Sequence, residues 1–148
     1  MLNNDYKDIL RALSKRKVKF LLVGAYAMAA HGYPRSTFDI DLWVMPDPEN
    51  AHLVLKALED FGAPSGDLST EDLQKEEIVF QIGVAPRRID ILTSIDGLKF
   101  DDAFSRSETV EIDAIPVHVL SVPDLIINKR STGRTKDLAD AELLEEKR

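Results

Sequence analysis

Residues 23–44 read VGAYAMAAHGYPRSTFDIDLWV, and the other elements of the chain can be placed around them. The pattern predicts the end of a strand, a turn at Gly24, a short alanine-rich helix, a loop that contains a proline, and a second strand. The second strand carries Asp39 and Asp41, with one apolar residue between them. Because successive side chains of a strand alternate between its faces, both carboxylates are expected on the same face.

Two carboxylates on one face of a strand repel each other. Their Cα atoms are expected about 6.5–7 Å apart, and at an effective dielectric constant of about 20 the repulsion is roughly 2–3 kcal/mol. The pair is therefore either solvated or holds a cation. A third acid favours the cation, because Asp90 lies inside the apolar strand expected over residues 88–92, where an unpaired charge is costly.

Two kinds of partner can neutralise Asp90. One is a neighbouring arginine, Arg87 or Arg88, and the other is a metal ion shared with Asp39 and Asp41. Three carboxylates without histidine or cysteine form a hard-oxygen site, which suits Mg²⁺ or Mn²⁺ better than zinc. A divalent metal site is therefore our leading hypothesis, and an arginine ion pair is the alternative.

The composition fits a single domain over residues 1–148, with a core over about 18–120 and C-terminal helices over about 121–147. The chain has no cysteine, no apolar run of membrane-spanning length and no signal-peptide pattern, so we expect a cytoplasmic protein without membrane contact. The formal net charge of −7 argues against broad electrostatic binding of nucleic acid. A polyanion would have to meet a local basic group, either Lys15-Arg16-Lys17 or the set Lys129, Arg130, Arg134 and Lys136.

Hydrophobic periodicity and capping residues predict the remaining elements. The expected caps are Asn3 or Asn4, Asp47 and Ser121 at helix starts, and Gly62 and Gly133 at helix ends. Together they indicate an α/β (α+β) fold, in which a mixed β-sheet has flanking helices and a C-terminal helical pair. The expected helices cover 4–16, 25–31, 48–61, 122 to the glycine at 133, and 136 onward. The expected strands cover 18–23, a run from 39 that ends by the proline at 46, 78–84, 88–92, 108–112 and 117–120, with a turn over 113–116.

Gly24 lies at the expected junction between a strand and a helix. A glycine there lets backbone N–H groups approach an anion, and the start of a helix favours negative charge. A tight turn alone would explain the same glycine. Both explanations are open at this point.

Three separated motifs together resemble the signature of the DNA polymerase β-like nucleotidyltransferase superfamily. That signature is an apolar residue and a glycine followed by glycine or serine, then an Asp-apolar-Asp strand about a dozen residues later, and a further acid on a later strand. In this chain the motifs are Val23-Gly24-Ala25, Asp39-Ile40-Asp41 and Asp90, and the resemblance extends from about Val18 to Leu144.

The local sequence is also similar to a small prokaryotic branch related to abortive-infection (AbiEii-type) nucleotidyltransferase toxins. This similarity implies a place in a toxin–antitoxin or phage-defence system, with a cognate toxin or antitoxin protein as a partner. It is carried by Ala29-Ala30-His31-Gly32, Arg35, Thr37, Asp124-Leu125-Ile126, Lys129-Arg130, Gly133-Arg134 and Lys136-Asp137-Leu138-Ala139-Asp140.

The superfamily resemblance implies transfer of a nucleoside monophosphate from an NTP to an acceptor hydroxyl, on an RNA 3′ end or a protein side chain, with release of pyrophosphate. In that mechanism two divalent ions, Mg²⁺ or Mn²⁺, bridge the triphosphate and the attacking hydroxyl. Asp39, Asp41 and Asp90 would be the catalytic and metal-binding residues, and Asp90 would help to deprotonate the acceptor. The implied nucleotide-binding residues are Gly24, Ala25, Arg35, Lys129, Arg134 and Lys136, with Thr37, His31 and Asp137 as further candidates.

Simpler roles are open for several of these residues. Lys129 would be solvated on an exposed helix face. Asp137 together with Asp140 would only cap the last helix. His31 would interact with carbonyl groups at a helix end. Trp43, which shares the face of Asp39 and Asp41, is expected to pack against other side chains rather than flank the site.

Ala25 departs from the family pattern, which has glycine or serine at this position. Without a hydroxyl, the residue offers only its backbone to a terminal phosphate. This leaves a second function open, namely a catalytically weak or inactive domain that binds nucleotide or a partner protein. A glycosyltransferase, which also uses Asp-x-Asp, fits less well because the chain is short and Gly24 lies on the wrong side of a helix.

Overall fold

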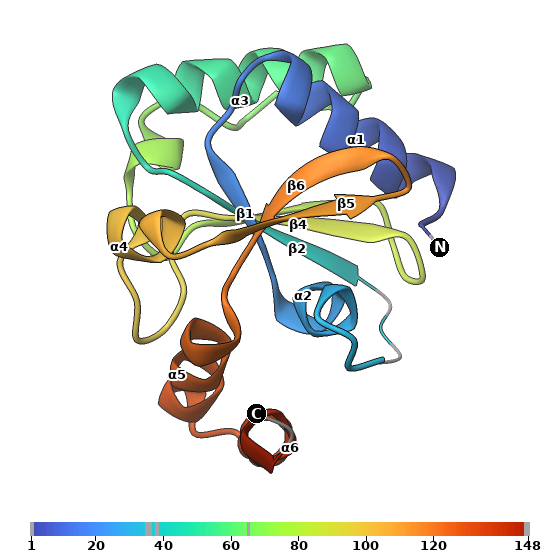
Figure 1. The fold of residues 1–148 in the computed structure, drawn as a ribbon. Coiled ribbons are helices and arrows are strands. Elements are labelled where there is room, and N and C mark those ends of the chain that lie inside the picture. Colours follow the sequence, from blue (N-terminus) through green and yellow to red (C-terminus); the bar gives the residue numbers. More distant parts are fainter. Residues whose placement is uncertain (1, 35–36, 38, 65, 147–148) are drawn as a thin grey trace.

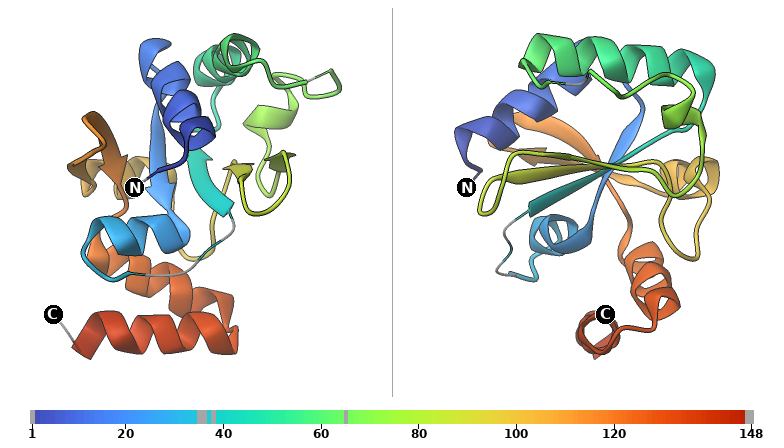
Figure 2. Two further views of the ribbon diagram at one scale, coloured as in Figure 1. Left: turned by 90° about the vertical axis from the view of Figure 1, so that its right-hand side faces the viewer. Right: turned by 180° about the vertical axis from the view of Figure 1, so that it is seen from behind.

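Residues 2–34, 37, 39–64 and 66–146 are described in a computed structural model of the protein. At their centre is a six-stranded sheet with the order β3-β4-β2-β1-β6-β5 (Figure 1). Helices α1 and α3 cover one face of the sheet, and α2, α5 and α6 lie on the other (Figure 1, Figure 2). The expected fold class, a mixed sheet with flanking helices and a C-terminal helical pair, is confirmed.

The sheet is mixed because parallel and antiparallel pairs alternate around its central strands. β2 is antiparallel to β1 and parallel to β4, and β1 is parallel to β6. The two outer pairs, β3 with β4 and β5 with β6, are antiparallel. The strands are β1 (Phe20–Val23), β2 (Asp39–Val44), β3 (Val79–Ile82), β4 (Arg88–Leu92), β5 (Glu108–Ile112) and β6 (Ile115–Val119).

Three of the helices, α1, α3 and α5, begin where their capping residues predict. Asn3 accepts a hydrogen bond from the Tyr6 backbone N–H, and Asp47 and Ser121 cap α3 and α5 in the same way. Both α3 and α5 end at a glycine with positive φ. The helices are α1 (Asn4–Lys15), α2 (Gly24–Ala30), α3 (Pro48–Phe61), α4 (Phe100–Ser105), α5 (Val122–Thr132) and α6 (Thr135–Glu146), and Asp72–Gln74 forms a short 3₁₀ turn.

The β5–β6 hairpin has a shorter turn than expected. Only Asp113 and Ala114 form it, both with positive φ (49° and 67°), which is the backbone of a two-residue hairpin turn. Pro116 therefore belongs to β6, although a proline argued for a turn. It is tolerated because it pairs with Glu111 one position beyond the hydrogen-bonded residues that flank the turn, so its missing N–H removes no bond to β5.

Helix α4 was not expected from the sequence, because it is only six residues long and has no side-chain cap at its start. Its Phe100 packs edge-to-face against Trp43, with ring centroids 5.1 Å apart. Trp43 is thereby buried, which confirms that it serves packing.

The faces of β2 differ in polarity. Ile40 and Leu42 are fully buried, while Asp39 and Asp41 point to the other face, on the side of α2 and α5. None of the helices in the described part of the chain has the length and apolarity that a membrane crossing requires.

Candidate active site

The register between β2 and β4 places four charged side chains in a two-by-two arrangement. Asp39 pairs with Arg88 and Asp41 pairs with Asp90 across these parallel strands. Because each strand contributes residues two apart, all four side chains are on one face of the sheet. β1 lies on the other side of β2, where Val23, the residue before Gly24, pairs with Asp41.

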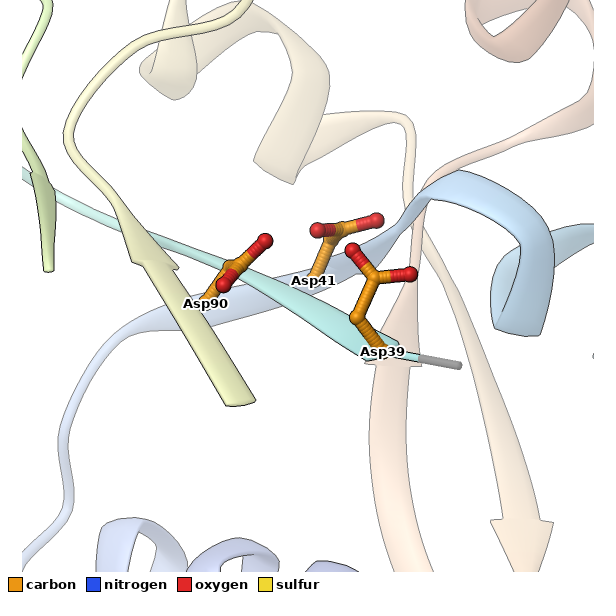
Figure 3. A group of neighbouring side chains, drawn as sticks. All are labelled: Asp39, Asp41 and Asp90. Carbon is orange, nitrogen blue, oxygen red and sulfur yellow. The ribbon is translucent and has the colours of Figure 1, made fainter. Parts of the chain in front are cut away.

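The three carboxylates converge (Figure 3). One oxygen from each of Asp39, Asp41 and Asp90 lies within 4.8 Å of the other two. Asp90 is only 5% exposed. A set of three carboxylate oxygens at this spacing fits a hard divalent cation such as Mg²⁺ or Mn²⁺. The role of these residues as metal ligands and catalytic groups stays a prediction.

Arg88 bridges two of the three acids. Its Nη2 donates to Asp39 Oδ2 (3.0 Å) and to Asp90 Oδ2 (3.2 Å), and its Nε donates to Asp90 Oδ1 (3.1 Å). Arg88 therefore forms the ion pair with Asp90 that the sequence analysis gave as the alternative to a metal ion. Its contact with Asp39 was missed, although the spacing of Arg88 and Asp90 already placed both on one face of a strand.

The three carboxylates differ in their affinity for protons. Burial, together with the charges of Asp39 and Asp90, raises the pKa of Asp41 to about 7. Burial also raises the pKa of Asp90, against the opposing effect of Arg88. For Asp39 burial acts in the same direction, but hydrogen bonds, among them those from Thr37 and Arg88, outweigh it and lower the pKa.

Gly24 has a φ of +71°, and a Cβ placed there would collide with the carboxylate of Asp41. The residue therefore meets two demands at once, a left-handed backbone and a close approach to an acid. Gly24 is also the first residue of α2, and it lines the same cavity as Ala25 and the triad.

A cavity of about 560 Å³ opens between the triad and the C-terminal helices. Gly24, Ala25, Thr37, Arg88 and the triad line one side of it. The other side is formed by residues of α5, α6 and the turn between them: Asn128, Lys129, Thr132, Arg134, Lys136, Asp137 and Asp140. Further wall residues come from β3, β4 and the loop after β4, including Val79, Leu92, Ile95 and Asp96.

Lys129 is 7% exposed, which excludes the alternative of a solvated lysine. Its Nζ lies 3.0 Å from Asp140 Oδ2 and 3.5 Å from Asp137 Oδ1. Asp137 also accepts hydrogen bonds from Thr132 Oγ1 and Arg134 Nε, each at 2.8 Å. Burial opposes ionisation of Asp137, but these donors and Lys129 lower its pKa overall. The sequence did not identify Thr132 or Asn128 as part of a site, and it named Asp140 only as part of the motif that begins at Lys136.

His31 is not among the described residues that line the cavity. His31 Nε2 is 2.8 Å from the carbonyl oxygen of Leu120, and its Nδ1 is 3.6 Å from a carboxylate oxygen of Glu108. His31 thus joins the end of α2 to the residues around β6. Arg35 lies outside the described residues.

The first basic group, at residues 15–17, is not near the triad. It begins with Lys15, the last residue of α1, and that helix covers the opposite face of the sheet. Its Arg16 pairs with Asp60 of α3, with Nε 2.6 Å from Oδ2.

The family model described as "Nucleotidyl transferase of unknown function" (DUF2204) matches residues 2–147. No curated protein matches the chain. The similarity to the abortive-infection branch is not confirmed by these findings and stays a prediction.

Solved structures share the fold. TM1012, a proposed nucleotidyltransferase from Thermotoga maritima, is 17% identical with a TM-score of 0.62, covering 99% of this chain and 94% of that one. The antibiotic-resistance factor ANT(2″)-Ia in solution is 17% identical with a TM-score of 0.64, covering 95% and 80%. ANT(2″)-Ia in complex with adenylyl-2″-tobramycin is 17% identical with a TM-score of 0.60, covering 94% and 84%. At this identity the likeness shows the fold alone.

Proposed function

This chain belongs to the DUF2204 family of nucleotidyl transferases, and we propose that it transfers a nucleoside monophosphate from an NTP to an acceptor hydroxyl with release of pyrophosphate. The observation that carries this proposal is the convergence of Asp39, Asp41 and Asp90 at one side of a cavity whose other side holds Lys129 and Arg134. Carboxylates suited to metal thus face cations suited to phosphate across one cavity.

The metal ligands we propose are Asp39, Asp41 and Asp90, and the ions Mg²⁺ or Mn²⁺. The ions, when bound, would neutralise charge on the triphosphate and on the acceptor oxygen. The donor set supports this assignment, because the carboxylate oxygens lie within 4.8 Å of one another and come from rigid neighbouring strands.

The bond changes are those of an in-line displacement. The acceptor oxygen forms a bond to the α-phosphorus of the NTP while the bond from that phosphorus to the bridging oxygen breaks, and pyrophosphate leaves. Asp90 accepts the proton of the acceptor hydroxyl. Burial, which raises the pKa of Asp90, makes it a better proton acceptor than an exposed aspartate.

The triphosphate would be neutralised mainly from α5 and α6. Lys129 is held in place by two aspartates, so it contributes an oriented charge at a partly dry site. Arg134 and Lys136 would add to it at the more exposed end of the cavity. Opposite them, the backbone N–H groups of Gly24 and Ala25 would meet a terminal phosphate, and Arg35 is assigned the same role from its motif.

The acceptor we propose is a hydroxyl of an RNA 3′ end or of a protein side chain, in a toxin–antitoxin or phage-defence setting with a cognate partner protein. A small hydroxylated molecule is a second candidate. It is favoured by the cavity wall formed by Val79, Leu92, Ile95 and Asp96, which offers apolar surface and a carboxylate but no cation. The ANT(2″)-Ia structure with adenylyl-2″-tobramycin is a neighbour of the same fold that holds a small adenylylated product.

The direct test follows label from each α-³²P-NTP, with Mg²⁺, into RNA, protein and aminoglycoside acceptors. We expect transfer by the wild type, and a loss of about 100-fold or more in Asp41→Asn and Asp90→Asn. Asp60→Asn is the matched control, because Asp60 lies in α3 on the opposite face of the sheet. If calorimetry shows tight binding of ATP with Mg²⁺ but no pyrophosphate is released, the proposal of an enzyme fails. The alternative suggested by Ala25, an inactive domain that binds nucleotide, would then be favoured.

A further inference from the structure

We propose that Arg88 is a built-in counter-cation of the triad, which a divalent ion must displace from Asp39 and Asp90 before the site is fully loaded. This inference rests on the proposed function, because it assumes that the triad binds a divalent metal. It adds a residue that is absent from the motifs quoted in the sequence analysis, and it assigns that residue a role in controlling metal affinity.

The hydrogen bonds around Arg88 use the same oxygens that a metal would need. Both oxygens of Asp90 accept from the guanidinium, at 3.1 and 3.2 Å. Asp39 Oδ2 accepts from Arg88 at 3.0 Å, and Asp39 Oδ1 accepts from the Thr37 hydroxyl at 2.9 Å. All four carboxylate oxygens of these two acids are therefore engaged.

Asp41 differs from the other two acids. Across the described ranges, no ion pair reaches its carboxylate. A first divalent ion can therefore approach Asp41 while Arg88 stays in place. Coordination by Asp39 and Asp90 as well brings a divalent charge next to the guanidinium, which contacts both acids. Arginine cannot give up a proton to relieve that repulsion, so we infer that its side chain moves away.

The position of Arg88 allows this movement. It occupies the fourth corner of the two-by-two arrangement, beside Asp39 in the register and two residues before Asp90. Its side chain is 36% exposed and lines the cavity, so it can rotate toward solvent without opening the core. Arg88 therefore relieves the repulsion among the three acids in the metal-free protein and competes with the metal for them.

The test measures Mn²⁺ binding without nucleotide, by calorimetry and by the Mn²⁺ electron paramagnetic resonance signal. Arg88→Met keeps a long side chain but removes the charge and the donors. We expect it to bind Mn²⁺ at least tenfold more tightly than the wild type. We also expect a lower melting temperature without metal and a larger rise in that temperature when Mn²⁺ is added.

Arg87→Met is the matched control, since it removes the same charge one residue away, at an exposed position. It should leave Mn²⁺ affinity within about twofold of the wild type. A double variant, Asp41→Asn with Arg88→Met, should lose the tight binding, which would locate the ion at the triad. Arg88→Lys retains the charge without the forked geometry and should give an intermediate affinity; it also serves if the methionine variant does not fold.

Equal or weaker Mn²⁺ binding by a folded Arg88→Met or Arg88→Lys variant would overturn the inference, as would an absence of Mn²⁺ binding by wild type and variants alike. Failure of the proposed function has a different outcome. In that case the Arg88 variants still bind Mn²⁺ more tightly, but the wild type transfers no nucleotide to any acceptor.

Discussion

Gly24 packs directly against Asp41, at the point where β1 passes into α2. The contact exists because Val23 and Asp41 are partners in the sheet, so the next residue of the chain passes beside the carboxylate. A side chain at position 24 would both strain the backbone and displace Asp41.

Gly24→Ala is therefore expected to damage the site more than the fold. The positive φ alone costs about 1–2 kcal/mol for alanine. Gly32→Ala is the control, because Gly32 also has a positive φ (+90°) but a Cβ there meets nothing within 4 Å. Denaturant unfolding should show similar losses for both variants, whereas Mn²⁺ affinity and nucleotidyl transfer should fall at least tenfold in Gly24→Ala only. Equal activity of the two variants would contradict the role of this contact.

Asp41 gives the metal-free protein a pH-dependent stability. Its pKa is about 7 in the folded protein and near the ordinary value of 3.8 when unfolded. A proton on Asp41 is thus bound more tightly in the folded state, and this binding stabilises the fold. The stabilisation is complete below about pH 4 and is lost as the pH rises toward 7.

Asp41→Asn should remove this loss, making the chelator-treated variant more stable than the wild type at pH 8 by about 2–4 kcal/mol, with little difference at pH 4. Urea unfolding of both proteins at both pH values measures this difference in the free energy of unfolding. Added Mg²⁺ should narrow the gap at pH 8, because the ion binds the ionised carboxylate of the wild type. A pH-independent difference between the two proteins would argue against a raised pKa.

Lys129 holds two aspartates of α6, and we expect it to serve both stability and nucleotide binding. Lys129→Met leaves Asp137 and Asp140 without their lysine and should lower the free energy of unfolding by about 3 kcal/mol. Adding Asp140→Asn should restore part of that stability. NTP affinity, measured by calorimetry, should stay low in the double variant. Recovery of affinity together with stability would reduce Lys129 to a structural role.

Ala25→Ser supplies the hydroxyl that the family pattern has at this position. A hydrogen bond to a charged phosphate contributes about 1.5 kcal/mol, so NTP affinity should rise roughly tenfold. Ala29→Ser makes the same change at an exposed position of the same helix, which does not line the cavity, and should have no effect on affinity. Identical NTP affinities for both variants and the wild type would place the terminal phosphate elsewhere.

Local sequence patterns predicted much of the fold. The caps at Asn3, Asp47 and Ser121 and the glycines at 62 and 133 placed helix ends correctly, because a cap is an interaction between residues a few positions apart. The hairpin turn and α4 escaped the same analysis. At the hairpin, the proline at 116 argued for a longer turn than the two residues that form it. Helix α4 has only six residues and no side-chain cap, so its sequence carries little helix signal.

The sequence by itself determined that Asp39 and Asp41 share a face and that Asp90 needs a partner, because side-chain alternation and the cost of burying a charge are local properties. Only the tertiary structure decided that Asp90 stands beside Asp41 and that Arg88 reaches Asp39 as well. It likewise decided that Lys129 is buried under α6. These relationships depend on the register of strands and the docking of helices, which are set by packing across the whole sheet and not by any single stretch of the chain.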